Sequence, residues 1–197
     1  SQVDAIDLEA LESVTVLRGP ASVLYGNASG GVVDMTTRSG ADLLYPQRFS
    51  VTGGSDGLRK THLQLGGAKD GNHHYLSLTG VRYQGQRDQS EMEKYLLTSR
   101  VGRALSVDRD VELFLTAMDT PMAEDPGGLT RAQVEQDRDQ AARFSNLLDA
   151  GQAVSQQRLG VLYRDRSLGG EVRARAFVTQ RDFTQQLPFP GSSLLDY

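Results

Sequence analysis

The sequence has 197 residues, a net charge of -4 and no cysteine, and 38% of its residues are hydrophobic. The missing cysteine excludes a disulfide framework, a thiolate nucleophile and a cysteine-based metal site, and the negative charge argues against a nucleic-acid partner. No run of about 18 apolar residues exists, which excludes a transmembrane helix, whereas a spanning β-strand needs only about 9–11 residues with alternate ones apolar.

The first 38 residues predict short elements separated by glycine and proline. Apolar residues at helical spacing predict a helical turn over residues 6–11, and residues 14–17 predict a strand that ends before Pro20. Residues 26–31 are rich in glycine and predict a tight loop. The β-branched residues of 32–37 predict a second strand.

After residue 40 the sequence becomes a series of strands with turn signals between them. The predicted strands are residues 47–54, 58–68, 73–84, 93–105, 111–118, 155–166 and 171–181. In residues 111–118 one face is apolar, and the other carries Glu112, Thr116 and Met118. In a soluble sandwich the charged face would be the outside, whereas in a membrane barrel it lines the wet lumen and the apolar face meets lipid.

The connections between these strands alternate in length. Short turns are predicted at residues 69–72, 106–110 and 167–170, and the connections that can grow long are residues 55–57, 85–92 and 119–154, the last with a polar helical patch near 130–143. Outer-membrane barrels have short periplasmic turns and longer outer loops, whereas so long a loop is awkward in a compact soluble domain. We therefore predict that the short turns lie at one end of the sheet and the long loops at the other.

Two stretches carry a family resemblance. Residues 12–26, ESVTVLRGPASVLYG, followed by residues 30–38, GGVVDMTTR, closely resemble the end of the plug domain in TonB-dependent outer-membrane receptors. Residues 125–130, with 149–151 and 156–160, resemble an outer loop and the following strand of siderophore-type receptors.

The resemblance implies a mainly β fold in two parts. Residues 1–40 would be the C-terminal part of the plug domain, and residues 41–197 would supply about seven antiparallel strands of a transmembrane barrel of about 22 strands. The chain would then be a fragment of a transporter in the bacterial outer membrane that takes up a ferric siderophore or similar large, scarce nutrient. Its implied partners are that ligand, membrane lipid and TonB, with no nucleic acid, cofactor or catalytic residue.

The resemblance also implies where the plug meets the barrel. We expect packing and a lock at Arg18, Gly19, Pro20, Gly26, Gly30 and Gly31. The Arg18 side chain is expected to face the concave side of the sheet and to approach a carboxylate of a strand. The glycines would permit a tight turn and close packing against the barrel wall. The ligand and its contact residues are not identified by the sequence.

Other candidate sites have weaker support in the sequence. The loop at residues 26–31 lacks the Lys-Ser/Thr that follows a phosphate-binding loop. His73 and His74 are adjacent in a strand and would point to opposite faces, and His62 stands alone, so no metal site is predicted. Residues 27–29 match a glycosylation acceptor by chance. The acidic loop 119–149 is interpreted as a solvated loop, as a mobile outer loop that closes over ligand, or as both.

Two readings from other classes compete with the transporter. A small soluble or secreted β-barrel binding protein would have to close within these strands, and residues 1–38 would need another role. A β-rich hydrolase would need a nucleophile and a base, and no Ser/His/Asp set has supporting spacing. Detergent dependence separates the first alternative from the transporter, and a turnover assay separates the second.

Overall fold

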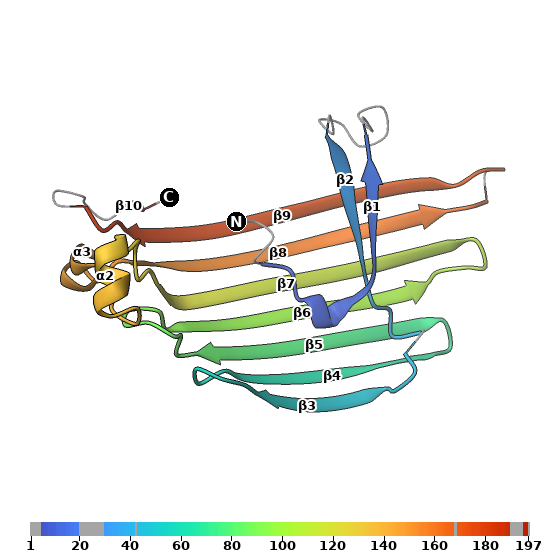
Figure 1. Cartoon of the computed structure of the whole chain (residues 1–197). Helices are drawn as coiled ribbons and strands as arrows, with labels where there is room; N and C mark the ends of the chain where they lie inside the picture. The colour runs from blue at the N-terminus through green and yellow to red at the C-terminus, as the bar shows by residue number, and fades with distance from the viewer. Residues whose placement is uncertain (1–4, 20–29, 42, 168, 190–194, 197) are drawn as a thin grey trace.

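The structure, a computed structural model, describes residues 5–19, 30–41, 43–167, 169–189 and 195–196. Its main feature is an eight-stranded antiparallel sheet in which each strand pairs with its neighbours in the sequence, in the order β10-β9-β8-β7-β6-β5-β4-β3 (Figure 1). A separate two-stranded hairpin, β1–β2, stands against one face of this sheet. No helix within the described residues is long and apolar enough to cross a membrane.

All seven strands predicted after residue 40 are present. They are β3 (Gln47–Gly53), β4 (Arg59–Lys69), β5 (Asn72–Tyr83), β6 (Met92–Ala104), β7 (Arg109–Glu124), β8 (Gly151–Asp165) and β9 (Val172–Gln186). The two-residue strand β10 (Leu195–Asp196) pairs with the end of β9. The mainly β, antiparallel fold is therefore confirmed.

The longest predicted loop is shorter than expected. Strand β7 continues to Glu124 and β8 begins at Gly151, so the connection covers residues 125–150. Within this extension Pro121 lies where the β7–β8 register shifts between Thr120 and Ala123. A proline is tolerated at such an irregularity because no ladder N–H is needed there.

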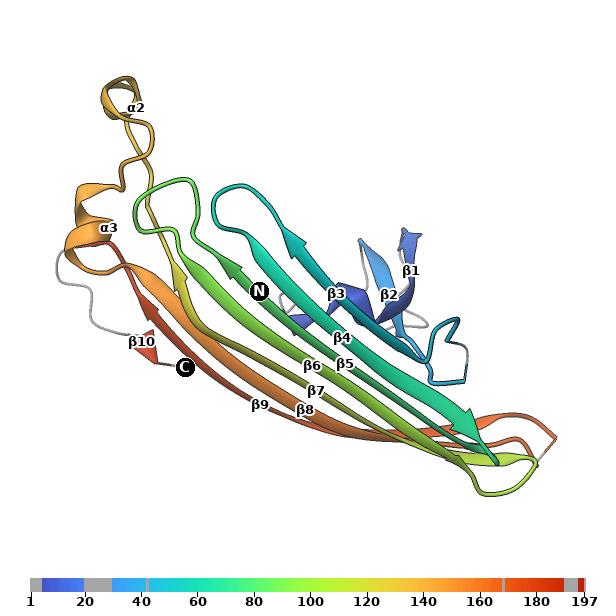
Figure 2. The same ribbon diagram turned by 90° about the horizontal axis from the view of Figure 1, so that it is seen from below.

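The predicted helical patch in this loop is two short helices. Helix α2 (Arg131–Gln136) begins with a capping box, in which Thr130 and Gln133 each bond the other's backbone N–H. Helix α3 (Arg143–Leu147) follows after residues 137–142. The loop thus has local structure of its own beyond the end of the sheet (Figure 2).

The two ends of the sheet differ as the turn lengths predicted. Neighbouring short turns bond to each other, since Ala104 N–H donates to Gly71 O at 2.8 Å and Arg166 N–H donates to Asp108 O at 2.9 Å. At the other end the long loops meet, with Asp88 N–H donating to Asp139 O at 2.8 Å. The prediction that short and long connections occupy opposite ends is confirmed.

The hairpin covers one face of the sheet, which we call the covered face. His62, Thr79, Leu96 and Met118 occupy one cross-strand row on that face, and all four are buried. The opposite, open face carries exposed apolar side chains, namely Phe49, Val51, Leu78, Val101, Leu113, Leu115, Leu159 and Val178. The predicted polar face is thus covered and the apolar face is bare, which is the reverse of a soluble sandwich.

The N-terminal part, which we call the hairpin segment, consists of residues 5–19 and 30–41. The 3-10 turn η2 (Leu8–Ala10) leads into β1 (Leu11–Arg18), which pairs with β2 (Gly31–Thr37) on the concave side of the sheet (Figure 2). The hairpin base is buried at Ala10, while the exposed fractions of Val14 and Val16 are 52% and 61%. The hairpin segment therefore contacts the sheet mainly at its base.

Candidate functional site

The contact between the hairpin segment and the sheet centres on a buried carboxylate. Asp7 precedes η2, and its Oδ1 caps the turn by accepting from Glu9 N–H at 3.1 Å. Its Oδ2 accepts from Ser77 Oγ at 2.7 Å and from Thr79 Oγ1 at 3.1 Å. Alternation along β5 puts both hydroxyls on the covered face, where His62 Nε2 also lies 3.1 Å from Ser77 Oγ. One aspartate thus fixes the turn and attaches it to β5.

A second carboxylate of the turn forms an ion pair with the neighbouring strand. Lys60 Nζ of β4 lies 2.6 Å from Glu9 Oε1, and about a third of each side chain is exposed. The hydrogen bond from Lys60 lowers the pKa of Glu9 below its ordinary value. Together Asp7 and Glu9 join η2 to β4 and β5.

The end of β2 is held by an arginine of the sheet. Arg100 Nη1 of β6 donates to Thr37 O at 3.0 Å, and the same guanidinium donates from Nε to Glu112 Oε2 at 2.8 Å. Glu112 is 6% exposed and also accepts from Arg164 Nη1 and Nη2, both at 3.0 Å. This buried glutamate therefore orients the arginine that binds the hairpin segment.

The linker after β2 passes very close to the sheet. A Cβ added to Gly40 would lie 1.9 Å from His74 O and 2.6 Å from Gly67 O. No side chain fits there without moving the backbone of β4, β5 or the linker. Gly40 therefore allows the hairpin segment to leave its site in direct contact with the sheet.

Apolar contacts complete the base of the hairpin segment. Leu96, Met118 and Val154 form a buried cluster across β6, β7 and β8. Ala5 packs on this cluster from the hairpin segment, and Phe183 of β9 packs on it from within the sheet. The polar contacts of Asp7 are thus flanked by a small dry patch, which strengthens them by excluding water.

The six residues predicted for packing and a lock are only partly described. Pro20 and Gly26 lie outside the described residues. Arg18 is exposed at the far end of β1 and makes no ion pair with any described residue. Gly31 has φ +136°, and a Cβ there would lie 2.6 Å from Leu17 O within the hairpin itself. A Cβ at Gly19 or Gly30 would meet nothing within 4 Å. The lock at Arg18 stays a prediction.

The contacts that hold the base have the opposite polarity to the expected lock. The sequence suggested an arginine of the hairpin segment against acids of the sheet, whereas Asp7 and Glu9 of the hairpin segment meet Ser77, Thr79 and Lys60 of the sheet. The only sequence signal for them was the Asp before a short helical turn, a common capping arrangement. Their partners in β4 and β5 are about fifty to seventy residues away, as the separations of 51 and 70 show.

A separate contact joins the two outer loops. Arg87 donates from Nη1 to Gly127 O at 2.8 Å, from Nη2 to Pro126 O at 3.1 Å, and from Nε and Nη2 to Gln140 O at 3.1 and 2.9 Å. Gln89 Nε2 donates to Asp149 Oδ1 at 2.8 Å. The connections 84–91 and 125–150 therefore form one unit.

The histidines of β5 lie as adjacent strand residues should. His73 is on the covered face, with Nε2 3.7 Å from Glu112 Oε1, while its neighbour His74 is on the open face beside Gly67. Within the described residues no three His, Cys, Asp or Glu side chains gather as a metal site would require.

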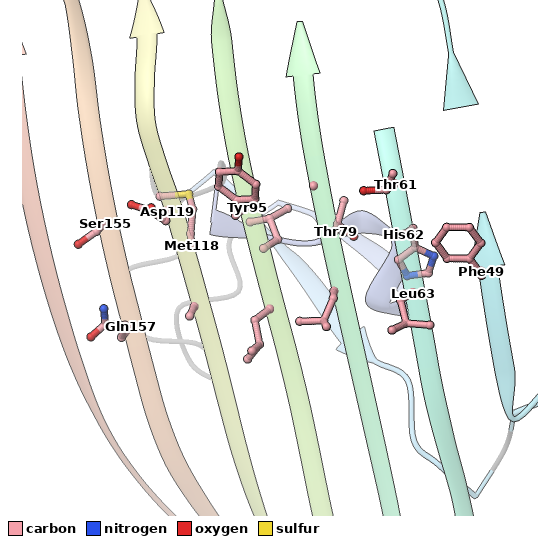
Figure 3. A pocket seen from close by; sticks show the side chains of 15 residues that line it. Phe49, Thr61, His62, Leu63, Thr79, Tyr95, Met118, Asp119, Ser155 and Gln157 are labelled. Carbon is pink, nitrogen blue, oxygen red and sulfur yellow. The ribbon is translucent and has the colours of Figure 1, made fainter. Parts of the chain in front are cut away.

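A hollow of about 690 Å³ lies on the open face, away from the hairpin segment (Figure 3). Phe49 and Leu63 supply apolar lining, and Asp119 and Ser155 supply polar lining (Figure 3). Leu78 adds to the apolar lining. Because the hollow faces away from the hairpin segment, it is not part of the contact described above.

Comparisons with known proteins agree with this architecture. Residues 1–32 match the family model of the TonB-dependent receptor plug domain. The unliganded ferric citrate transporter FecA has a similar solved structure, with a TM-score of 0.74 and 25% sequence identity over 92% of this chain. In its first 32 residues and in its fold the chain resembles a portion of a TonB-dependent receptor. It spans 28% of the length of that transporter chain, and both similarities are to receptors and transporters, not to enzymes.

Proposed function

We propose that this chain is the end of the plug and the start of the barrel of a receptor that takes up a ferric siderophore, or a similar large nutrient, across the bacterial outer membrane. Residues 1–40 belong to the plug and residues 41–197 to the barrel wall. The receptor is energised through TonB, and the chain performs no bond chemistry.

The observation that carries this proposal is the inverted distribution of polar and apolar side chains. The face toward the plug buries polar side chains such as Ser77, Thr98 and Glu112, while the face away from it exposes Leu113 and Leu159. An apolar outer face is stable only against lipid, and a polar inner face suits a wet lumen that holds a plug. A soluble binding protein would aggregate through such a face.

The dimensions of the apolar face support a membrane location. Tyr163 and Tyr95 both face outward, and Tyr163 lies near the short turns. Tyr95 is at the same level of the sheet as Ser155 of β8, because Tyr95 pairs with Asp119 and Asp119 pairs with Ser155. The separation from residue 163 to 155 along β8 corresponds to about 26 Å of strand, or about 20 Å of height at a tilt of about 40°. Apolar bands flanked by aromatic residues are about 25 Å tall in such barrels.

In this proposal the plug contacts must hold at rest and yield during transport. Asp7, Glu9 and Arg100 attach the plug by hydrogen bonds and ion pairs to an inner wall that water can reach once the plug moves. Such contacts exchange for water at modest cost, unlike a large apolar interface. Arg18 would add a further contact with acids of the wall beyond this chain.

Iron uptake by the full-length receptor tests the function. The gene is deleted in its host, and uptake of radiolabelled iron is measured under iron limitation with a panel of ferric siderophores, with and without TonB. We expect at least one complex to require both the gene and TonB. If the deletion leaves the uptake of every complex unchanged, the proposal is overturned. Retention of the product in the soluble fraction without detergent would favour the small-barrel alternative.

A further inference from the structure

The inner wall formed by β8 and β9 carries a line of arginines. The lumen-facing arginines of these strands are Arg158, Arg164, Arg173, Arg175 and Arg181. They share the face of Gln156 and Leu162, which are buried on the plug side. Residues 173 to 181 cover about 26 Å along β9, so the positive charges follow most of the height of the wall.

Some of these charges are balanced within the wall and others are not. Arg164 lies 2.6 Å from Asp110 Oδ2 and 3.0 Å from Glu112 Oε1, and Arg173 pairs with Glu171 at the turn. The structure describes every residue of β7, β8 and β9, and the lumen-facing carboxylates of these strands are Asp110 and Glu112. Both carboxylates form ion pairs with arginines.

Among the described residues, the remaining three arginines have only uncharged contacts. Arg158 Nε donates to Thr179 Oγ1 at 3.0 Å, and Arg181 Nη1 donates to Gln156 Oε1 at 3.1 Å. Arg175 makes no ion pair with any described residue. These side chains leave a net positive charge on the wall.

Two aromatic rings orient Arg158 and Arg181, the arginines nearer to the long loops. The Arg158 guanidinium carbon lies 5.4 Å from the centre of the Phe177 ring, and that of Arg181 lies 5.9 Å from the centre of the Phe183 ring. Such cation–π contacts orient a guanidinium without neutralising it. Among the described residues, the charge of these two guanidinium groups is therefore not balanced by a carboxylate.

At Arg158 the line of arginines borders open space beside the plug. A cavity of about 470 Å³ lies between the hairpin segment and the wall, with Leu11, Val33 and Met35 on one side and Gln156 and Arg158 on the other. A molecule that passes along the wall when the plug moves would meet Arg158 there.

We propose that β8 and β9 form a cationic path that selects for anionic cargo. This deepens the proposed function and rests on it: among ferric complexes, those with negative charge, held by carboxylate or catecholate oxygens, are the substrates. Arg158, Arg175 and Arg181 act as specificity residues that attract the complex electrostatically along the wall, since a cleft lined by one sign of charge raises the local concentration of the opposite ion.

The test compares an anionic with a neutral cargo in the full-length receptor. The probes are ferric citrate and a ferric tris-catecholate, both anionic, against a neutral ferric trihydroxamate. The double variant Arg158→Gln with Arg181→Gln should lower uptake of the complex that the wild type transports by about tenfold at low salt, and less at high salt, where charges are screened. The change should fall on the maximal rate more than on cell-surface binding.

Two further variants separate charge from structure. The double lysine variant, Arg158→Lys with Arg181→Lys, keeps the charge and should keep most of the uptake, while Arg131→Gln, at an arginine of α2 that is 92% exposed, should change nothing. If the lysine variant fails as badly as the glutamine variant, the arginines are structural and the inference is overturned. A wild type that transports the neutral complex but neither anionic one overturns the inference and leaves the transport function intact. A wild type that transports none of them overturns both.

Discussion

The two ends of the sheet are held together by different chemistry. At the end with short turns, Glu112 and Asp110 bind Arg100, Arg164 and Arg166, so side chains of the strands bind one another. At the end with long loops, Arg87 binds three backbone carbonyls of the facing loop.

This difference shows which end can change without loss of the fold. Strand register fixes the partners of Glu112, so a substitution there disturbs several strands at once. Arg87 binds backbone carbonyls, which every residue type carries, so side chains of the loop can change without removing these hydrogen bonds. The end with long loops is thus joined mainly through one side chain, Arg87, with Gln89 adding a bond to Asp149. The four predictions below test this contrast.

The largest effect is expected from Glu112→Ala. The substitution leaves Arg100 and Arg164 without their shared carboxylate in a buried place, and breaking such a pair costs about 3–5 kcal/mol. Urea unfolding of the full-length receptor in detergent measures the loss. The control is Glu135→Gln, whose partner Arg131 is 92% exposed and which should cost less than about 0.5 kcal/mol. Equal midpoints for the two variants would contradict the assigned role of Glu112.

Arg87→Ala should have a smaller and local effect. Its hydrogen bonds to carbonyls are charge-assisted, each contributing about 1.5–3 kcal/mol, but their loss frees only the loop 125–150. Hydrogen exchange should rise across α2 and α3 while the strands stay protected. Arg87→Lys should restore little because an ammonium cannot bind as a planar fork. Faster exchange throughout the sheet would show that the loops are not a separate unit.

Asp7→Asn should loosen the plug without disturbing either end of the sheet. Ser77 and Thr79 then donate to a neutral acceptor in place of a carboxylate, a loss of about 1 kcal/mol. Protease cleavage near the hairpin segment should become faster, with the unfolding midpoint of the barrel unchanged. Glu12→Gln, at an exposed residue of β1, is the matched control. Indistinguishable cleavage of the two variants would remove Asp7 from the attachment.

The smallest effect is expected from acidification. The pKa of Glu9 is lowered by Lys60 in the folded protein, so the stabilisation is present above the ordinary value of 4.5 and is lost as the pH falls through the lowered value. Because both side chains are partly exposed, the loss is at most about 1 kcal/mol. Plug protection measured from about pH 7 to about pH 3 should fall in this window, and Glu9→Gln should abolish that component. If the Glu9→Gln variant loses as much plug protection on acidification as the wild type, the loss is due to the titration of other groups.

The fold was largely predictable because local signals determine it. Alternation and turn residues located all seven strands, and turn lengths separated the two ends. The largest difference in a strand boundary is the end of β7, where Pro121, a residue that normally breaks a strand, coincides with a register shift. That tolerance depends on the partner strand β8, which a local pattern does not include.

The candidate site was much less predictable. The resemblance pointed to residues 18–31, which the structure describes only in part. The attachment found at Asp7 depends on Ser77 and Thr79, which are ordinary strand hydroxyls until the hairpin segment is placed over them. Long-range polar contacts of this kind follow from packing, and no spacing rule in one sequence encodes them.

The register of the hairpin has a mechanical consequence for transport. Leu11 at the start of β1 pairs with Thr37 at the end of β2, so the two strands of the hairpin enter and leave at the same place. The hydrogen bond from Arg100 and the close approach of Gly40 hold the C-terminal end of β2 against the sheet. In the proposed transporter, a pull from the N-terminal side therefore loads the pairs one after another, from Leu11–Thr37 toward Arg18–Gly31. A hairpin loaded in this way unzips stepwise under a small force, whereas the same pairs pulled lengthwise would resist together.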